Sequence, residues 1–390
     1  MKILMLRTNA VAPDPRVEKE ASSLIKKNKF DVEIHAWDRN GKYKCKKEKL
    51  SLPNGEVNIY RVGIKGNWGK GMKKNIIPAL KYELSLFLWL MKNAKKYDCI
   101  HAFDLMTGYP ALLPVKLFKK KFVYDCCDYY ADSQHGPKII MNKLRKMETK
   151  VINRADVTIL CSEKRITQIS PANPKKVYYI HNSPNMEDYN INKTDKICKT
   201  NSKKLKLVYV GNFCEDRWLI ELLNAVKKMP KEIEMHIGGF GGLESEIRNL
   251  SESSSNIYFY GKLKYEDVLT LENECDCIVA LYETHLRNHI YAAPNKFYEA
   301  LALGKPLLMI KNSGMSEIVE KENIGATMNT DFNSFKTAIE KIKELLDEDK
   351  KLSQRMQKLF KDKYSWKIME KKLYNIYEKE LTVKSEESTE

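Results

Sequence analysis

The residues best suited to chemistry lie in the segment 293–306, APNKFYEALALGKP. Pro294 and Asn295 predict the start of a helix, and the Gly-Lys-Pro that follows predicts its end. The free backbone N–H groups at such a start, with Lys296 among them, favour a bound phosphate anion. Glu299 lies one turn further along, where a carboxylate accepts two hydrogen bonds from the vicinal hydroxyls of a ribose. The segment therefore predicts a site for the diphosphate and ribose of a nucleotide.

A second cation and a glycine-rich turn precede this segment. Arg217 follows a strand-like run in VGNFCEDRWL, and an arginine guanidinium binds phosphate oxygens as a fork. Arg217 and Lys296 together predict a diphosphate clamp. The sequence HIGGFGGLESE places Gly239 in a turn that either approaches a ligand or only bends the chain sharply. Its spacing is not that of a dinucleotide fingerprint.

In the first half of the chain, titratable side chains follow two predicted strands. His101 and Asp104 occur in YDCIHAFD, where His101 is either an acceptor contact or a structural histidine. Asp128, in FVYDCCDYY, is the best acidic candidate in this half for the sugar or an acceptor hydroxyl.

These residues sit in a regular alternation of elements. Apolar runs of strand length alternate with helix-period stretches, which predicts parallel strands joined by crossover helices. Strands are expected at 3–6, 32–37, 99–103, 122–126, 157–161, 177–180, 205–210, 233–237, 257–260, 278–281 and 307–310. The expected fold class is α/β, with two Rossmann-like domains that face each other across a cleft. In such sheets ligands bind beyond the carboxyl ends of the strands.

A polar stretch without periodicity marks the boundary between the two halves. We expect an N-terminal domain over 1–185, a linker over 186–204 and a C-terminal domain over 205–364. A helix over 365–380 and a disordered tail over 381–390 follow.

The charge is uneven along the 390 residues, which carry a formal net charge of +17. Residues 1–200 hold 39 Lys and Arg against 20 Asp and Glu, and the rest hold 29 against 31. One explanation is a lysine-rich bias of all the host's proteins. The other is that the first half binds a polyanion, which could be nucleic acid, an anionic membrane or a phosphorylated acceptor. No recognition-helix or RNA-sheet motif supports nucleic acid, so no nucleic-acid partner is expected.

Nine cysteines form no zinc pattern, and the start MKILMLR is unlike a signal peptide, so we expect a cytoplasmic protein. No segment reaches the ~20 apolar residues needed to cross a bilayer. The nearest, 76–91, predicts either a buried helix or a helix at a membrane interface. The second alternative rests on Trp68 and on flanking lysines, namely Lys65, Lys70, Lys73, Lys74, Lys92, Lys95 and Lys96.

In order and spacing, these segments resemble the family-four (group 1) retaining glycosyltransferases of the GT-B fold. The matching segments are PDPRVEKEASSL, YDCIHAFD, FVYDCCDYY, ADVTILCSE, HNSPN, VGNFCEDRWL, the glycine-rich turn and PNKFYEALALGKPLL. The resemblance implies transfer of a sugar from a uridine- or guanosine-diphosphate sugar to a glycan or lipid-linked acceptor. It further implies that the anomeric configuration is kept and that no metal or other cofactor takes part.

The resemblance also assigns roles to residues. The second half binds the donor nucleotide, with Gly211, Asn212, Gly239 and Asn295 beside Arg217, Lys296 and Glu299. The first half holds the acceptor, and the final helix from Trp366 packs back on it. Asp128, Arg217 and Lys296 are the expected catalytic residues.

Three positions depart from the family pattern. Tyr291 stands eight residues before Glu299, where the family commonly has a glutamate that contacts the donor sugar. Cys127-Asp128 replaces a His-Glu pair near the sugar, and Asn212 replaces an arginine. Tyr291 and Cys127 therefore join His101 and Asp104 as candidate contacts of the sugar or the acceptor.

The expected function is thus sugar transfer in the synthesis of a cell-surface polysaccharide or glycoconjugate, at the inner face of a membrane through the basic N-domain. The alternatives are a nucleotide-sugar epimerase of the same fold and a non-catalytic protein that binds glycan or nucleic acid.

Overall fold

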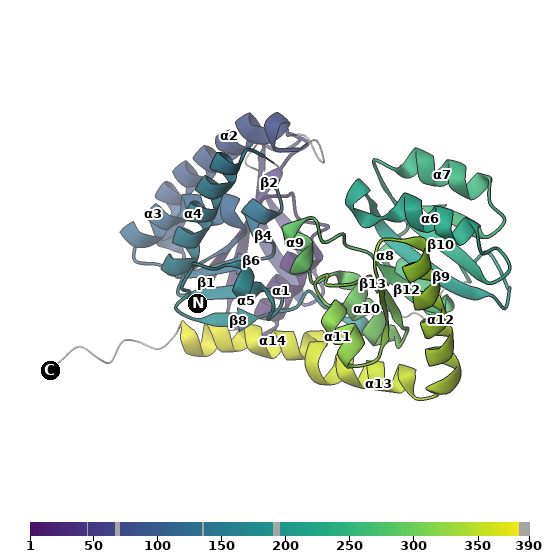
Figure 1. Cartoon of the computed structure of the whole chain (residues 1–390). Coiled ribbons are helices and arrows are strands. Elements are labelled where there is room, and N and C mark those ends of the chain that lie inside the picture. Colours follow the sequence, from purple (N-terminus) through teal and green to yellow (C-terminus); the bar gives the residue numbers. More distant parts are fainter. Residues whose placement is uncertain (45, 67–70, 135, 190–195, 382–390) are drawn as a thin grey trace. The chain divides into compact units, whose positions relative to one another are not determined.

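A computed structural model describes the chain except residues 45, 67–70, 135, 190–195 and 382–390. It divides into two compact units (Figure 1). The first unit comprises Met1–His181 and Met369–Glu390, and the second comprises Asn182–Ile368. Each unit is built on a parallel sheet with helices, which confirms the expected α/β class.

The first unit contains an eight-stranded sheet in the order β3-β4-β2-β1-β5-β6-β7-β8. All neighbouring strands are parallel except the pair β3 and β4, which is antiparallel. The strands are β1 (Lys2–Arg7), β2 (Asp31–Asp38), β3 (Lys46–Leu52), β4 (Gly55–Gly63), β5 (Cys99–Phe103), β6 (Lys121–Cys126), β7 (Val157–Leu160) and β8 (Val177–Tyr179).

The helices of this unit cover the sheet. They are α1 (Pro15–Lys26), α2 (Gly71–Asn93), α3 (Leu105–Leu117), α4 (Lys138–Arg154) and the short α5 (Arg165–Gln168). α1 begins after Asp14, which caps it by accepting a hydrogen bond from the Val17 amide at 3.3 Å, with proline next in the chain. α2, α3 and α4 lie side by side on one face of the sheet (Figure 1).

The C-terminal helix α14 (Trp366–Asn375) and its continuation Ile376–Glu380 are held to the first unit by tyrosine and lysine side chains. The Tyr374 hydroxyl donates to the Ser23 carbonyl at 2.9 Å, and the Lys372 ammonium donates to the Tyr179 carbonyl at 3.0 Å. The Tyr377 hydroxyl lies 2.7 Å from His101 Nδ1.

The second unit contains a parallel six-stranded sheet in the order β11-β10-β9-β12-β13-β14. The strands are β9 (Leu205–Phe213), β10 (Ile233–Gly241), β11 (Ile257–Gly261), β12 (Cys277–Ala280), β13 (Leu307–Ile310) and β14 (Gly325–Met328). The helices are α6 (Leu219–Lys227), α7 (Glu244–Glu252), α8 (Tyr265–Glu274), α9 (Arg287–Ile290), α10 (Asn295–Leu303), α11 (Ser316–Lys321), α12 (Phe332–Glu348) and α13 (Leu352–Leu359).

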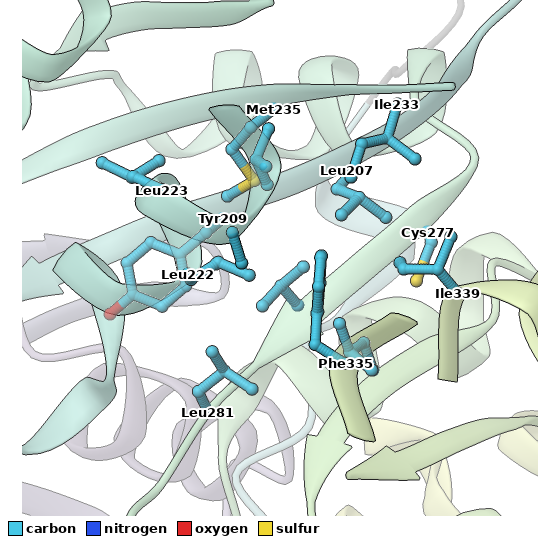
Figure 2. Packing of buried hydrophobic residues seen from close by; sticks show 14 of the residues in the cluster. Leu207, Tyr209, Leu222, Leu223, Ile233, Met235, Cys277, Leu281, Phe335 and Ile339 are labelled. Atoms are coloured by element: carbon cyan, nitrogen blue, oxygen red, sulfur yellow. The ribbon is translucent and has the colours of Figure 1, made fainter. Parts of the chain in front are cut away.

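The core on one face of this sheet joins strands to two helices (Figure 2). Leu207 of β9 and Met235 of β10 are fully buried against Leu222 of α6, and Phe335 and Ile339 of α12 belong to the same cluster. This core fixes β9 and β10, whose carboxyl ends carry several of the candidate donor residues.

The hairpin of β3 and β4 was not among the expected strands. Pro53 and Asn54 form its two-residue turn, and Leu52 pairs with Gly55, but β3 exposes Lys46, Lys47 and Lys49 and lacks an apolar run. β10 also extends beyond the expected 233–237, because it pairs with β9 as far as Gly241.

His35 in β2 is a buried histidine that should make the protein sensitive to acid. It is fully buried beside Trp89, with ring centroids 4.8 Å apart, and neither ring nitrogen has a hydrogen-bond partner within the described residues. Burial lowers its pKa to about 3. Because the unfolded chain gains the His35 proton near its usual pKa of about 6.5, stability falls as the pH drops from that value towards 3.

We expect the His35→Leu variant to lose about 2 kcal/mol less stability than the parent when the pH is lowered from 7 to 5. Urea unfolding followed by tryptophan fluorescence measures this difference. The matched control is His285→Leu at an exposed histidine, which should leave the pH dependence unchanged. If the free energy of unfolding fell equally in the parent and in His35→Leu as the pH was lowered, His35 would not be the source of the acid sensitivity.

Candidate active site

α10 begins at Asn295 and ends before Gly304, whose φ is 68°, so the predicted helix is confirmed. Asn295 is exposed at the N-terminus and accepts a hydrogen bond from Asn182 Nδ2 at 3.1 Å. The half-buried Lys296 ammonium donates to the Val210 carbonyl near the carboxyl end of β9. A positive charge and a helix N-terminus therefore meet at the edge of the sheet where ligands bind in α/β folds.

Arg217 is fixed by two aromatic residues. Its guanidinium carbon lies 3.7 Å from the centroid of the Tyr282 ring, and Nη1 lies 3.2 Å from His289 Nε2. His289 Nδ1 is 2.9 Å from the Glu283 carbonyl, to which it donates, so Nε2 is left to accept from Arg217. The contacts with Tyr282 and His289 therefore hold the Arg217 guanidinium in one orientation before a ligand binds.

Tyr209 of β9 links the two cations. The Lys296 ammonium lies 4.9 Å from the Tyr209 ring centroid, and the Tyr209 hydroxyl donates to the Asn212 carbonyl at 2.8 Å. Burial raises the pKa of Tyr209 above its usual range, and the charge of Arg217 acts in the opposite direction. Both cations therefore act on the same tyrosine at the end of β9.

Glu299 is buried on α10, with 3% of its surface exposed. The Tyr265 hydroxyl donates to Glu299 Oε1 at 2.8 Å, and within the described residues no hydrogen bond involves Oε2. Glu272 lies nearby on α8, where burial raises its pKa well above the usual range and the charge of Glu299 acts in the same direction. A neutral Glu272 next to Glu299 leaves a single carboxylate charge for a ligand.

The glycines have packing roles that the structure explains directly. A Cβ on Gly211 would stand 3.1 Å from the Lys296 ammonium, so this glycine gives the lysine room. Gly239 has φ 141°, and a Cβ there would stand 1.8 Å from the Gly211 carbonyl oxygen. The close approach of β9 and β10 therefore accounts for Gly239 without a ligand.

The remaining donor candidates lie in the same unit. Asn212 is exposed at the end of β9. Tyr291 is half-buried and directly follows α9. The structure thus places Asn212, Arg217 and Lys296 around the end of β9, and Glu299 one turn further along α10.

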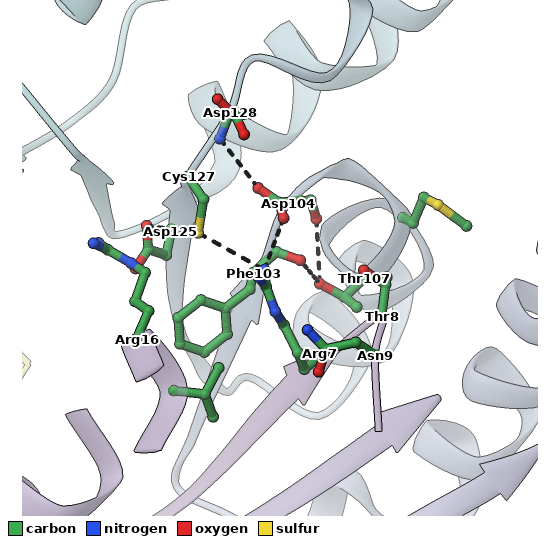
Figure 3. Close-up of polar contacts among 12 residues, drawn as sticks. Arg7, Thr8, Asn9, Arg16, Phe103, Asp104, Thr107, Asp125, Cys127 and Asp128 are labelled. Atoms are coloured by element: carbon green, nitrogen blue, oxygen red, sulfur yellow. Dashed lines mark hydrogen bonds and ion pairs between the residues drawn. The ribbon is translucent and has the colours of Figure 1, made fainter. Parts of the chain in front are cut away.

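In the first unit a polar cluster forms where three neighbouring strands end (Figure 3). Arg7 ends β1, Asp104 follows β5 and Cys127 follows β6. Arg7 Nη1 donates to Asp104 Oδ2 at 2.8 Å and lies 3.8 Å from Cys127 Sγ. The Asp128 amide donates to Asp104 Oδ1 at 3.4 Å. Asp104, Cys127 and Asp128 are thus brought together as the strand order requires.

The two carboxylates of this cluster differ in character. Burial raises the pKa of Asp104 to about 6, although the charge of Arg7 opposes the shift. The Asp128 side chain is 57% exposed and pairs with Arg165 at 2.7 Å. Asp104 is therefore suited to exchange a proton near neutral pH.

His101 does not contact an acceptor, which corrects one alternative for this residue. It lies inside β5, is fully buried and is bonded to Tyr377 of the C-terminal helix. Its Nε2 lies 3.9 Å from Glu20 and from Asp125, both fully buried. Burial lowers the pKa of His101 to about 3, so it stays neutral. The residue is structural.

A cavity of about 830 Å³ lies in the first unit beside Asp104. Its polar lining includes Thr8, Arg39 and Glu83, and burial raises the pKa of Glu83 to about 7. The apolar lining comes from α2, α3 and α4 and includes Leu80, Leu105, Met106, Leu144 and Met147. The cavity suits a ligand with a polar end and an apolar body.

Sequence reasoning missed four residues of these sites: Arg7, Tyr265, Glu272 and His289. Each acts through a partner distant in sequence, such as Asp104 for Arg7 and Glu299 for Tyr265. The one available signal was the closeness of His289 to Tyr291, which the sequence had marked as a candidate contact of the sugar.

Residues 190–362 match the family model described as Glycosyl transferases group 1. The match to this family covers most of the second unit of the chain. The matched residues include Arg217, Lys296 and Glu299, so the candidate donor residues lie inside the region that matches the family. No curated protein matches the chain in sequence.

Solved glycosyltransferase structures share the fold of both units, which is of the GT-B type. Sucrose-phosphate synthase from Thermosynechococcus elongatus matches with a TM-score of 0.72 and 13% identity, over 97% of this chain and 98% of that one. A glycosyltransferase from Rickettsia africae matches with a TM-score of 0.69 and 15% identity, over 98% and 99%. Anabaena HepE in complex with UDP matches with a TM-score of 0.66 and 14% identity, over 97% and 100%.

Proposed function

We propose that this protein is a glycosyltransferase that moves a sugar from a nucleoside-diphosphate sugar to a glycan or lipid-linked acceptor and keeps the anomeric configuration. The observation that carries the proposal is the arrangement of Lys296, Arg217 and Glu299 around the end of β9 and the start of α10. Similar structures were determined with UDP, UDP-glucose or ADP, which supports a nucleotide donor.

The chemistry assigned to the second unit is stabilisation of the leaving group. As the bond between the sugar C1 and the phosphate oxygen breaks, negative charge grows on the diphosphate. Preorganised cations and a helix N-terminus stabilise that charge without a metal ion. Glu299 holds the ribose and keeps the diphosphate in register with Lys296 and Arg217.

The first unit is proposed to hold the acceptor. The acceptor hydroxyl forms the new bond to C1, and its proton passes to an oxygen of the leaving phosphate. Asp104, with its pKa raised to about 6, is the group in this unit best suited to orient that hydroxyl, and Arg7 positions it. Asp128, which pairs with Arg165, is proposed to assist Asp104 in orienting the acceptor.

An assay across UDP- and GDP-sugars tests this function. We expect slow hydrolysis of one donor without acceptor, faster turnover with lipid-linked glycans, a product of unchanged anomeric configuration by NMR, and rates that added magnesium or manganese does not raise. Turnover that only interconverts the donor with an epimer, or no turnover of any donor, would contradict the proposal.

The acceptor class follows from the surface of α2. Tyr82, Leu86 and Leu90 are fully buried on one face of this helix. The opposite face carries exposed apolar side chains at helical spacing, namely Ile77 (67% exposed), Leu80 (59%), Leu84 (59%) and Leu88 (51%). The face of α2 opposite the core is therefore both exposed and apolar.

We propose that this apolar stripe of α2 lies on an anionic membrane surface. Leu80 belongs both to the stripe and to the cavity lining, so an apolar chain can pass from the membrane towards Asp104. Exposed lysines flank the helix at positions 65, 92, 95 and 96. Trp68 and Lys70, and the side chains of Lys73 and Lys74, lie outside the described residues. No helix within the described ranges is long and apolar enough to cross a membrane.

Replacing Ile77 and Leu84 by serine should weaken binding to vesicles of anionic lipid about 10- to 30-fold, since each half-exposed side chain contributes about 1 kcal/mol. Vesicle co-sedimentation at low salt measures the loss. Phe240→Ser, at a 52% exposed phenylalanine in the second unit, is the matched control and should bind as the parent does. Equal binding of the double variant and the parent would contradict the membrane contact.

A further inference from the structure

Three potential metal ligands from distant parts of the chain converge in the second unit. Cys198, His236 and Cys275 are buried, and one ligand atom from each lies within 4.8 Å of the other two. Cys198 Sγ lies 3.8 Å from His236 Nδ1 and 3.9 Å from Nε2. In a tetrahedral zinc site, with Zn–S about 2.3 Å and Zn–N about 2.0 Å, ligand atoms lie about 3.5–3.8 Å apart.

The backbone holds Cys198 firmly in place. The segment before β9 is tied to α8, because the amides of Ile197 and Cys198 donate to Glu274 Oε2 at 3.0 and 2.6 Å. The next residue, Lys199, donates from its amide to the Tyr260 hydroxyl at 3.0 Å. These backbone hydrogen bonds therefore fix the position of the Cys198 thiol.

His236 has the partner that metal-bound histidines usually have. Its Nδ1 lies 2.8 Å from the Tyr260 hydroxyl oxygen. When Nδ1 carries the proton and donates it to Tyr260, Nε2 keeps its lone pair for a metal ion. The second contact of Tyr260, with the Lys199 amide, fixes the phenol and hence the ring of His236.

Glu234 lies beside this cluster, two residues before His236 on the same face of β10. Its side chain is buried, with 1% exposed, and its Oε2 lies 3.8 Å from His236 Nε2. Its other oxygen, Oε1, lies 3.6 Å from the Lys204 ammonium. Glu234 is outside the group of ligand atoms that lie within 4.8 Å of one another, so the fourth position around a metal ion is left to a water molecule.

We propose that Cys198, His236 and Cys275 bind one zinc ion, with a water molecule as the fourth ligand. On binding, each of the two thiols loses a proton to solvent, and the two thiolates balance the charge of Zn²⁺. A Cys198–Cys275 disulfide would instead need an oxidant and would leave His236 without a role. Cysteine and histidine ligands favour zinc over magnesium or calcium.

The zinc ion has a structural role. It joins the segment around Cys198 to β10 and to the start of β12, since Cys275 lies two residues before Cys277. The donor residues lie at the opposite, carboxyl end of β9 and β10, and His236 precedes Gly239 by three residues. The metal therefore stabilises the segment that enters the donor-binding unit and takes no part in the proposed sugar transfer.

Titration of the reduced, chelator-treated full chain with zinc chloride tests the proposal. We expect one equivalent to bind and to raise the melting temperature, because zinc binds the folded chain. Cobalt chloride should give a thiolate-to-cobalt charge-transfer band in the near ultraviolet. Cys198→Ser should abolish that band and weaken zinc binding at least ~100-fold.

Cys277→Ala is the control, since Cys277 is a buried cysteine of the same unit and lies outside the cluster. It should keep the cobalt band. Cys198 lies outside the strands and helices, so its replacement leaves the sheet intact, which far-ultraviolet circular dichroism checks. A cobalt band retained in Cys198→Ser, no zinc-dependent stabilisation of the parent, or a Cys198–Cys275 disulfide in the peptide map of protein purified without reductant would overturn the proposal.

Discussion

The Lys296→Ala variant is expected to lose about 100- to 1,000-fold in kcat, the size of effect seen when one preorganised charge-stabilising donor is removed. The Lys296 ammonium stands at the N-terminus of α10 and contacts the end of β9. It is therefore placed where the leaving diphosphate gains charge. Steady-state rates of donor hydrolysis or sugar transfer measure the loss, which should fall mainly on kcat.

Two further variants make this prediction specific. Lys305→Ala removes a half-buried lysine just beyond the other end of α10 and should keep nearly the parental rate. Gly211→Ala would place a Cβ 3.1 Å from the Lys296 ammonium and should lower kcat by displacing it. If Lys296→Ala and Lys305→Ala had the same rate, Lys296 would have no part in the transfer.

Replacing Glu299 by glutamine should weaken binding of the nucleotide about 100-fold. Two hydrogen bonds from the ribose to a charged group, worth together about 3 kcal/mol, are lost or weakened. Glutamine keeps the shape of the side chain, so the contact with Tyr265 can persist. Calorimetric titration with the nucleoside diphosphate measures the dissociation constant.

A 2′,3′-dideoxynucleoside diphosphate shows whether the loss comes from the ribose. The parent should bind this analogue about 100-fold more weakly than the natural nucleotide, and Glu299→Gln should bind the two almost equally. Tyr265→Phe is the control, since it removes a neighbour of Glu299 without removing the carboxylate. If Glu299→Gln still discriminated fully between the two nucleotides, Glu299 would not hold the ribose.

Local patterns predicted most of the fold. Apolar runs predicted the central parallel strands of both units, and Pro294-Asn295 and the Gly-Lys-Pro stop predicted the two ends of α10. The β3–β4 hairpin was not predicted, because β3 is a lysine-rich edge strand without an apolar run. β10 was placed too short because its last residues are glycines, which are strand-like only through pairing with β9.

The candidate sites were predictable only where one segment holds the chemistry. Lys296 and Glu299 share a helix, so their spacing was informative. Arg7 and Glu272 depend on strand and helix neighbours that the sequence does not reveal. His101 shows the opposite difficulty, because its position before Asp104 resembles a site, yet it lies within β5 and bonds to Tyr377. The sequence shows no metal motif at the zinc site, because nearly 40 residues separate Cys198 from His236 and His236 from Cys275.

Calorimetric titration of the intact chain with UDP, GDP and ADP tests most directly whether the second unit binds a nucleotide. We predict one site per chain for one of these nucleotides, with binding strongly weakened in Lys296→Ala and Glu299→Gln and preserved in Lys305→Ala. The absence of binding by all three nucleotides, or binding that both variants retain unchanged, would contradict the account.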